Sequence, residues 1–230
     1  HPLEALKNIK DIRLHHNELT KIIDKNLIKR LKAYQEFVDF DFDNCSKNTG
    51  EYFDVLISPD CDYVIKILRP KKGVDYIKTK EFVLDSYRLN KRYFSQFLPR
   101  EEFFEKDGIL FIKAEKITGE VEEQLDIETK MTGDLSNIKR LLNDDTFRTQ
   151  FQEFIDSVIL FNKEARNIEG NGNLLPDLAG RNTKIIFNNL GHFQRIVYID
   201  TTGYLVRSEN YSPIFDLIKE NIYKFKELLE

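Results

Sequence analysis

The sequence is short of several residue types whose abundance marks whole classes of protein. It has no tryptophan, one methionine, 6 prolines and 10 glycines among its 230 residues. Its two cysteines, Cys45 and Cys61, are too few for a disulfide-stabilised secreted domain and do not form the Cys-x-x-Cys pair of a metal or redox motif. No apolar run approaches the length of about 18 residues that a membrane span needs. No secretory signal is visible either, so we expect a cytoplasmic protein without a membrane span.

The charge balance is close to neutral. Lys and Arg number 35 and Asp and Glu number 39, which gives a formal net charge of −4. Proteins that coat nucleic acid are usually strongly basic, so we expect no nucleic-acid partner. Hydrophobic residues at 41% and aromatic residues at 12% can build a sizeable core. The length then favours one large domain or two lobes that share a cleft.

Hydrophobic periodicity divides the chain into helices and strands. Apolar residues three and four apart predict helices, and alternating or continuous apolar runs between polar turns predict strands. The helices are expected at residues 17–37, 75–97, 146–163 and 212–230. The strands are expected at residues 39–43, 52–57, 63–68, 102–104, 109–114, 183–187 and 195–200.

This order of elements predicts an α+β protein with two lobes. The first lobe, residues 38–117, combines a five-stranded antiparallel sheet with one inserted helix. The second lobe, residues 118–230, is mostly helical. Residues 1–37 form an N-terminal helical extension that we expect to brace the first lobe, and binding a partner is the alternative. Binding sites often lie between two lobes, so the boundary near residue 117 is a place to look for one.

Three short segments carry polar residues in positions of interest. Lys66 follows the apolar residues Tyr-Val-Ile in a predicted strand, although a lysine there is also explained as an edge residue whose amine reaches solvent. Asp177 and Asn182 lie five residues apart in a loop, where both residue types also favour turns. Asp200 directly follows the apolar run of another strand. Each segment alone therefore has an ordinary structural explanation.

Taken together and in this order, the three segments resemble the signature set of the protein-kinase-like superfamily, which includes protein kinases and the aminoglycoside and choline kinases. Tyr63–Lys66 corresponds to Val-Ala-Ile-Lys, and Asp177–Asn182 to the catalytic loop Asp-Leu-x-x-x-Asn. Asp200 corresponds to the magnesium-binding aspartate. The resemblance covers residues 38–215 and implies a compact two-lobed kinase-like fold, with a five-stranded antiparallel N-lobe and an abbreviated helical C-lobe, closer to small-molecule or minimal bacterial kinases than to full protein kinases.

The resemblance also implies a reaction. ATP and Mg²⁺ would be bound, and the γ-phosphate would move to a hydroxyl of a small molecule or a protein, mainly through positioning and charge neutralisation. By this resemblance Lys66 holds the α- and β-phosphates, and Asp177 accepts the proton of the attacking hydroxyl. Asn182 and Asp200 then supply the oxygen ligands that Mg²⁺ prefers.

Two further roles follow from the same resemblance. A carboxylate of the following helix would orient Lys66; Glu81 is our first choice, and Asp85, one turn later, is the alternative. Residues 109–117 would form the strand and hinge that hold adenine. The backbone groups that face the base would be those of Glu115, Lys116 and Ile117.

The chain departs from the family pattern in four places. Leu175 and Pro176 replace the usual histidine and arginine before the catalytic aspartate, and the third motif reads Asp-Thr-Thr-Gly in place of Asp-Phe-Gly. The segment 44–50, expected between the first two strands and near the phosphates, has a single glycine. After Asp200 only 30 residues remain (230 − 200), too few for the peptide-binding platform of an ordinary protein kinase.

Three interpretations of the sequence remain open. The first is an ATP-dependent phosphotransferase with a shortened second lobe. The second is a pseudokinase, a nucleotide-binding or scaffolding module of the same fold, favoured by the glycine-poor phosphate loop and the short C-terminal part. The third is an α+β domain without a nucleotide site, whose candidate site residues would be scattered over the surface. Those residues are Lys66, Asp177, Asn182 and Asp200.

Overall fold

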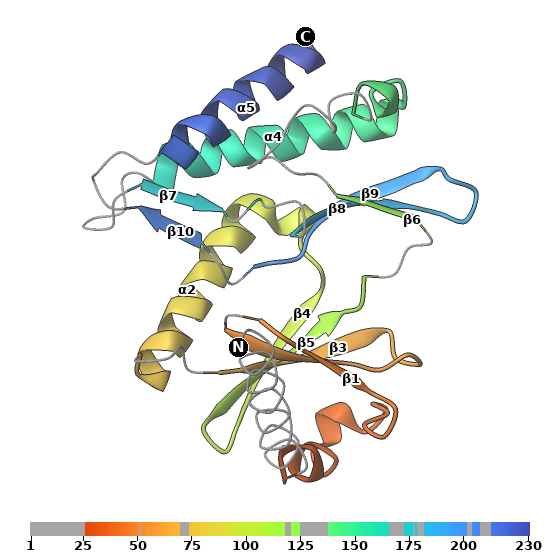
Figure 1. The fold of residues 1–230 in the computed structure, drawn as a ribbon, viewed down its shortest axis with the longest axis vertical. Helices are drawn as coiled ribbons and strands as arrows, with labels where there is room; N and C mark the ends of the chain where they lie inside the picture. The colour runs from red at the N-terminus through yellow and green to blue at the C-terminus, as the bar shows by residue number, and fades with distance from the viewer. Residues whose placement is uncertain are drawn as a thin grey trace, which may run out of the picture.

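The structure is a computed structural model, and it has an α+β architecture. A five-stranded antiparallel sheet forms the lower part of the molecule in Figure 1, and helices α4 (Asp145–Ala165) and α5 (Pro213–Leu229) lie in the upper part with two smaller sheets. The five-stranded antiparallel sheet predicted from the sequence is confirmed. The structure describes residues 26–50, 52–69, 74–117, 121–124, 138–165, 173–176, 178, 182–201, 204–207 and 213–230.

The strand order of the large sheet is β1-β2-β3-β5-β4, and every neighbouring pair is antiparallel. The β4–β5 hairpin turns at Asp107 (φ 51°) and Gly108 (φ 74°), left-handed conformations that suit a tight hairpin. Because β5 lies between β3 and β4, side chains on the same face of β3 and β4 approach each other across β5. The strands are β1 Ser46–Thr49, β2 Phe53–Ile57, β3 Tyr63–Leu68, β4 Glu101–Lys106 and β5 Ile109–Glu115.

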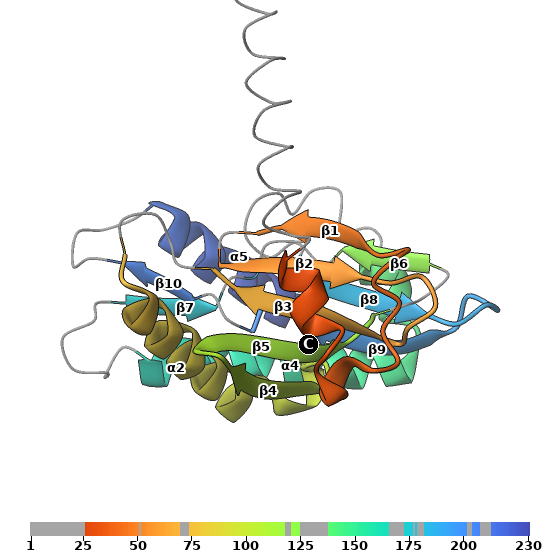
Figure 2. The ribbon, with the colours of Figure 1, turned by 90° about the horizontal axis from the view of Figure 1, so that it is seen from below.

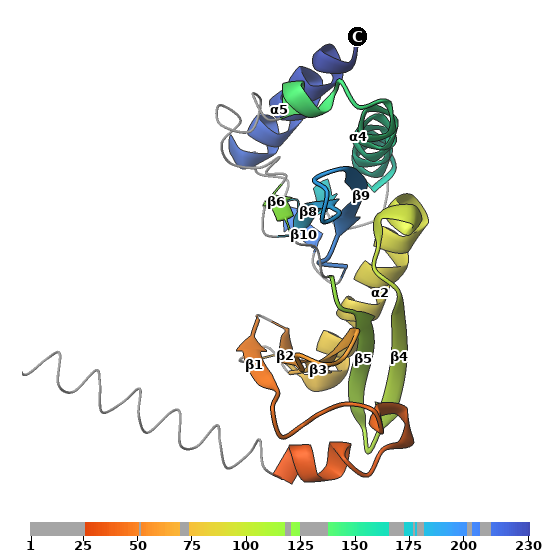
Figure 3. The ribbon, with the colours of Figure 1, turned by 90° about the vertical axis from the view of Figure 1, so that its right-hand side faces the viewer.

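Different segments cover the two faces of this sheet. Phe37 and Phe40 pack on one face, and Leu31 from a short helical stretch at residues 26–31 joins them. Figure 2, viewed from below, shows this segment in front of the sheet. Helix α2 (Tyr76–Phe94) covers the opposite face through Val83, as the side view shows (Figure 3). The sheet therefore contributes to two separate clusters of buried side chains.

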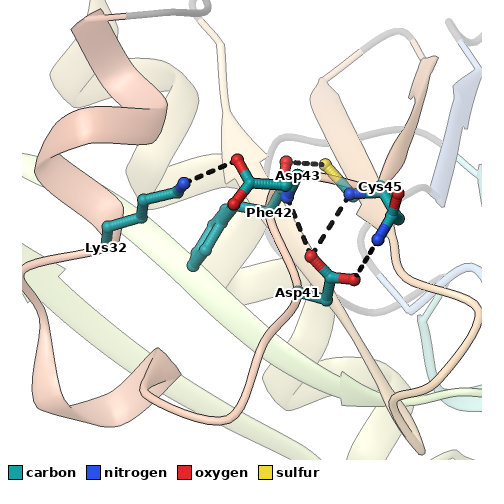
Figure 4. A network of polar contacts seen from close by, with 6 residues as sticks. Lys32, Asp41, Phe42, Asp43 and Cys45 are labelled. Atoms are coloured by element: carbon teal, nitrogen blue, oxygen red, sulfur yellow. Dashed lines mark hydrogen bonds and ion pairs between the residues drawn. The ribbon is translucent and has the colours of Figure 1, made fainter.

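The first strand is not the one that the sequence predicts. Residues 39–43 form turns, and the segment 44–50, interpreted as a loop, contains β1. Asp41 Oδ1 accepts hydrogen bonds from the backbone N–H groups of Asp43 (2.9 Å) and Asn44 (3.2 Å), which closes the turn (Figure 4). The turn is further held by an ion pair between Lys32 Nζ and Asp43 Oδ1 at 2.7 Å.

The alternation of phenylalanine and aspartate in this region has a different origin from a strand. The rings of Phe40 and Phe42 lie 4.8 Å apart, and Phe40 also lies 5.6 Å from the ring of Tyr63 on β3. Both phenylalanines are buried because the turn folds back onto the sheet. The helix predicted for residues 17–37 likewise ends near residue 31 and is followed by a 3₁₀ turn at Gln35–Phe37; residues before 26 lie outside the described part of the chain.

We call the parts of the molecule that correspond to the predicted lobes, residues 38–117 and 118–230, its first and second halves. The second half contains more strand than the mostly helical lobe that the sequence predicts. β6 (Val121–Gln124), β8 (Thr183–Phe187) and β9 (Phe193–Tyr198) form one sheet in the order β6-β8-β9. A second sheet pairs β7 (Asn173–Pro176) with β10 (Tyr204–Arg207). Helix α4 packs its phenylalanines at three- and four-residue spacing against this half, and these are Phe147, Phe151, Phe154 and Phe161.

Helix α2 belongs to both halves of the molecule. Its middle residue Val83 lies against the large sheet, whereas Phe94 at its end lies in the core of the second half. The ring of Phe94 is 5.8 Å from Phe154 on α4 and 5.4 Å from Tyr198 on β9. Among the helices that the structure describes, none combines the length and hydrophobicity needed to cross a membrane.

Candidate functional site

Lys66 lies on the face of β3 that is covered by α2, and β3 is the middle strand of the sheet, so Lys66 is not an edge lysine. Its Nζ is 2.7 Å from Oε1 of Glu101, the first residue of β4. The exposed fraction is 14% for the lysine side chain and 0% for the glutamate side chain. A charge held at this depth needs a partner, and each of these residues is the partner of the other.

The second oxygen of Glu101 connects this pair to the other half of the molecule. Thr201 Oγ1 donates a hydrogen bond of 2.8 Å to Glu101 Oε2, and the carbonyl of Thr201 accepts one of 3.1 Å from Asn90 Nδ2 on α2. Thr201 and Asn90 are both fully buried. We call Lys66, Glu101, Thr201 and Asn90 the bridging network, because it joins β3, β4, α2 and the segment after β9.

Two of the predicted site residues lie beside this network. Asp200, partly buried, directly precedes Thr201 in the chain. Asn182 is 8% exposed, and its backbone carbonyl accepts a hydrogen bond of 2.7 Å from the N–H of Ile199. Lys66 is thus linked through Glu101 to Thr201, the residue after Asp200, whereas Asn182 contacts the same segment through its backbone at Ile199. Asp177 lies outside the described residues.

The helix carboxylates expected to orient Lys66 are not its partners. Glu81 and Asp85 are both exposed on α2, and Asp85 pairs with Arg88 at 2.9 Å. The reason is the phase of the helix: the side chains that α2 buries carry no charge. These are Thr79, Val83, Ser86, Asn90 and Phe94. The carboxylate therefore comes from β4, which lies beyond β5 in the same sheet.

The hinge predicted for residues 115–117 has much of its backbone committed to the sheet. The N–H of Glu115 donates to the carbonyl of Arg100 at 2.8 Å, and the N–H of Lys116 donates to the carbonyl of Asp62 at 2.8 Å. Neither N–H can therefore serve a base as expected. For Ile117, no backbone hydrogen bond to another residue in the described part of the chain is found. Among the three hinge amides, Ile117 is thus the one without a backbone partner in the described part of the chain.

The side chain of Glu115 makes a contact between the halves that the sequence does not indicate. Arg195 on β9 donates to Glu115 Oε1 at 2.6 Å, and the backbone N–H of Arg100 donates to Oε2 at 3.2 Å. Burial raises the pKa of the Glu115 carboxyl, but the hydrogen bonds from Arg195 and Arg100 outweigh it and the pKa lies below its ordinary value. Glu115 therefore acts as a charged link between the two halves.

The turn between β1 and β2 differs from the expected phosphate loop. Because β1 occupies residues 46–49, the connection to β2 is reduced to residues 50–52. The N–H of Gly50 donates to the carbonyl of Phe53 at 2.7 Å, and its carbonyl accepts from Arg69. The one glycine of this region thus uses its backbone groups within the hairpin and does not offer its amide to a phosphate.

A cavity of about 430 Å³ lies at the end of the large sheet, and Glu115 is the predicted site residue that lines it. Its lining includes five carboxylates and two cationic side chains. A triphosphate would meet repulsion there, so this cavity is a poor phosphate site. The five carboxylates are those of Asp39, Asp60, Asp62, Glu102 and Glu115.

The oxygen ligands proposed from the sequence are compatible with Mg²⁺ but few. In the part of the chain that the structure describes, no group of three or more His, Cys, Asp or Glu side chains is placed to hold a metal ion. Asn182 and Asp200 offer one amide and one carboxylate oxygen. Mg²⁺ commonly takes only one or two protein carboxylates and fills its octahedron with phosphate oxygens and water. The donor types of these two residues are therefore compatible with a metal that arrives with a nucleotide.

Sequence reasoning missed Glu101 and Thr201, the two residues that connect the site. Glu101 is in phase with the apolar Phe103 along β4, which places it on the covered face of the sheet. An acidic residue in phase with the buried side of a strand was a usable signal that a cationic partner is needed. The position of Thr201 directly after Asp200 carried no comparable signal.

No protein-family model matches this chain, and no curated protein is similar to it in sequence. The functional argument therefore depends on the geometry of the residues described above.

Proposed function

We propose that this protein is an ATP- and magnesium-dependent phosphotransferase that moves the γ-phosphate to a hydroxyl group. The observation that carries the proposal is the bridging network, in which a lysine of the third strand and the residue after Asp200 bind the same buried carboxylate. An α+β domain without a nucleotide site has no evident need to bury a charged lysine next to that segment. Burial of a charge is costly, which favours a functional reason for it.

Each residue of the proposed site has one task. Lys66 neutralises charge on the α- and β-phosphates, and Asn182 and Asp200 hold Mg²⁺, which would neutralise further charge on the phosphates. Asp177 accepts the proton of the acceptor hydroxyl while the oxygen of that hydroxyl forms a bond to the γ-phosphorus. The bond from that phosphorus to the β–γ bridging oxygen breaks, and ADP leaves. The Ile117 amide is the hinge group that would contact adenine.

The acceptor is proposed to be a small molecule or a protein hydroxyl that approaches Asp177.

A second candidate function is a pseudokinase, a module that binds a nucleotide or a partner without phosphoryl transfer. The specific observation in its favour is the β1–β2 hairpin, where the Gly50 amide is bonded to Phe53 and offers nothing to a phosphate. Weak binding of the β- and γ-phosphates would lower or abolish transfer.

One experiment tests the proposal and separates the two candidates. Thermal unfolding is measured with Mg-ATP and with ATP plus EDTA. At a nucleotide concentration near 100 times Kd, stabilisation of about 2.7 kcal/mol should raise the Tm by roughly 5–10 °C. An enzyme also releases phosphate or labels itself, and Asp177→Ala abolishes this while Asp156→Ala, on the exposed face of α4, does not. Binding without transfer would favour the pseudokinase, and no response at millimolar ATP would contradict both.

A further inference from the structure

Glu101 occupies a position from which it contacts both halves of the proposed site. Glu101 on β4 is in register with Ala114 on β5, and Lys66 on β3 is in register with Ile112, two residues away on the same face. Two strand spacings, roughly 10 Å, separate the backbones of Lys66 and Glu101. The side chains of Lys66 and Glu101 together span that distance, on the face to which Ala114 contributes only a methyl group. The small side chain of Ala114 leaves room for this contact.

Both carboxylate oxygens of Glu101 are used, and each serves a different half. Oε1 binds Lys66 at 2.7 Å, and Oε2 accepts from Thr201 at 2.8 Å. Since the side chain of Glu101 is fully buried, water does not compete for either contact. Hydrogen bonds to a charged group in such surroundings are among the stronger ones in proteins. A fixed carboxylate thereby sets the distance between the lysine and the segment that carries Asp200.

We infer that Glu101 is the positioning residue of the proposed nucleotide site, and that it holds Lys66 toward the phosphates and the Asp200 segment toward the metal at the same time. This inference rests on the proposed function. It differs from the arrangement expected from the sequence, in which a glutamate of the helix orients the lysine. The buried face of α2 carries no charge, so this helix supplies no carboxylate to Lys66.

The test measures ATP affinity twice for each variant, once with excess Mg²⁺ and once with EDTA. Glu101→Gln removes the charge that holds Lys66, so ATP should bind about tenfold more weakly in both conditions. Thr201→Val keeps the shape but loses the hydroxyl that holds the Asp200 segment. Its affinity should fall about tenfold with Mg²⁺ and stay within twofold of the parent with EDTA. The difference between the two conditions is a readout that a general loss of structure would not produce.

Glu102→Gln is the matched control, because Glu102 is the next residue on β4, is exposed and points to the opposite face. It should bind ATP as the parent does in both conditions. Glu101→Asp, which restores the charge with a shorter side chain, should recover part of the loss. If Glu101→Gln does not fold, Thr201→Val and Glu101→Asp still decide the question.

Failure of the positioning role and failure of the proposed function give different results. If the parent binds ATP and Lys66→Ala weakens it while Glu101→Gln and Thr201→Val match Glu102→Gln, the positioning role is overturned and the proposed function stands. If the parent binds no ATP in either condition, the proposed function fails and the inference fails with it.

Discussion

Lys66 and Glu101 form an ion pair in which one side chain is fully buried and the other nearly so. Removing one partner of such a pair leaves a buried charge without compensation, which is costlier than removing both. The same arrangement that would serve a nucleotide therefore makes the folded state sensitive to changes at these two positions. Stability measurements at the pair thus complement measurements of nucleotide binding.

We expect Lys66→Met to lower the free energy of unfolding by about 3 kcal/mol, because Glu101 would remain buried as an unpaired carboxylate. The double variant Lys66→Met with Glu101→Gln should be more stable than Lys66→Met alone. Urea unfolding followed by circular dichroism measures both. Lys80→Met is the control, because Lys80 pairs with the half-exposed Glu105 at 3.0 Å and its loss should cost less than about 1 kcal/mol. Equal losses at Lys66 and Lys80 would contradict this interpretation.

Two tyrosines of the first half should respond in opposite directions to removal of the hydroxyl. The Tyr63 hydroxyl is buried and has no hydrogen-bond partner in the described part of the chain, and burial raises the pKa of Tyr63 to about 12. The Tyr34 hydroxyl instead donates a hydrogen bond of 2.7 Å to Asp107 Oδ2. We expect Tyr63→Phe to be neutral or to stabilise by up to about 1 kcal/mol, and Tyr34→Phe to destabilise by about 1 kcal/mol. A loss for Tyr63→Phe as large as for Tyr34→Phe in chemical unfolding would show a missing partner.

Helix α2 begins at a well-defined cap. Asp75 Oδ1 accepts hydrogen bonds from the N–H groups of Ile77 (2.8 Å) and Lys78 (3.3 Å), which otherwise have no partner inside the helix. We expect Asp75→Ala to lower the free energy of unfolding by about 1 kcal/mol. Asp85→Ala on the same helix loses only the exposed pair with Arg88 and should change it by less than about 0.5 kcal/mol. Thermal or urea unfolding compares the two; an equal effect would argue against the cap.

The elements that the sequence predicts well are those with a strong apolar period. Helix α2 and strand β3 are examples, since each buries side chains at its own repeat. Strand β1 was missed because Ser46–Thr49 is a polar edge strand with no buried side chain, while the nearby Phe40 and Phe42 mimic a strand from within a turn. The position of β5 between β3 and β4 depends on tertiary packing and not on local sequence. The contact between Lys66 and Glu101 follows from this strand order, so it could not be predicted from the sequence.

At the scale of the whole molecule, the ion pair between Glu115 and Arg195 joins the two halves. The side chain of Glu115 is 17% exposed. The hydrogen bonds from Arg195 and Arg100 hold the pKa of Glu115 below the ordinary value of 4.5 despite burial. A carboxyl whose pKa is lowered on folding contributes stability above its unfolded pKa and loses it as the pH falls through its folded pKa.

We therefore expect the contribution of Glu115 to be complete above about pH 4.5 and to disappear at lower pH, so that the free energy of unfolding declines on acidification. Arg195→Gln should weaken this pH dependence, because the pKa of Glu115 would move toward its unfolded value. Unfolding in urea between pH 3 and pH 6 measures it. Arg88→Gln, which removes an exposed pair within α2, should leave the profile unchanged. An unaltered profile for Arg195→Gln would show that Glu115 is not the titrating link.

Helix α2 packs against both halves of the molecule, and this has a consequence for synthesis on the ribosome. Phe94 ends a helix that is anchored on the first sheet, but its ring packs on Phe154, which is translated about 60 residues later. At the usual rate of roughly 5–20 residues per second, the end of the nascent helix waits for several seconds with its aromatic surface exposed. Chaperone contact during this interval should fall on the segment that ends with Phe97, which belongs to the same late-forming core.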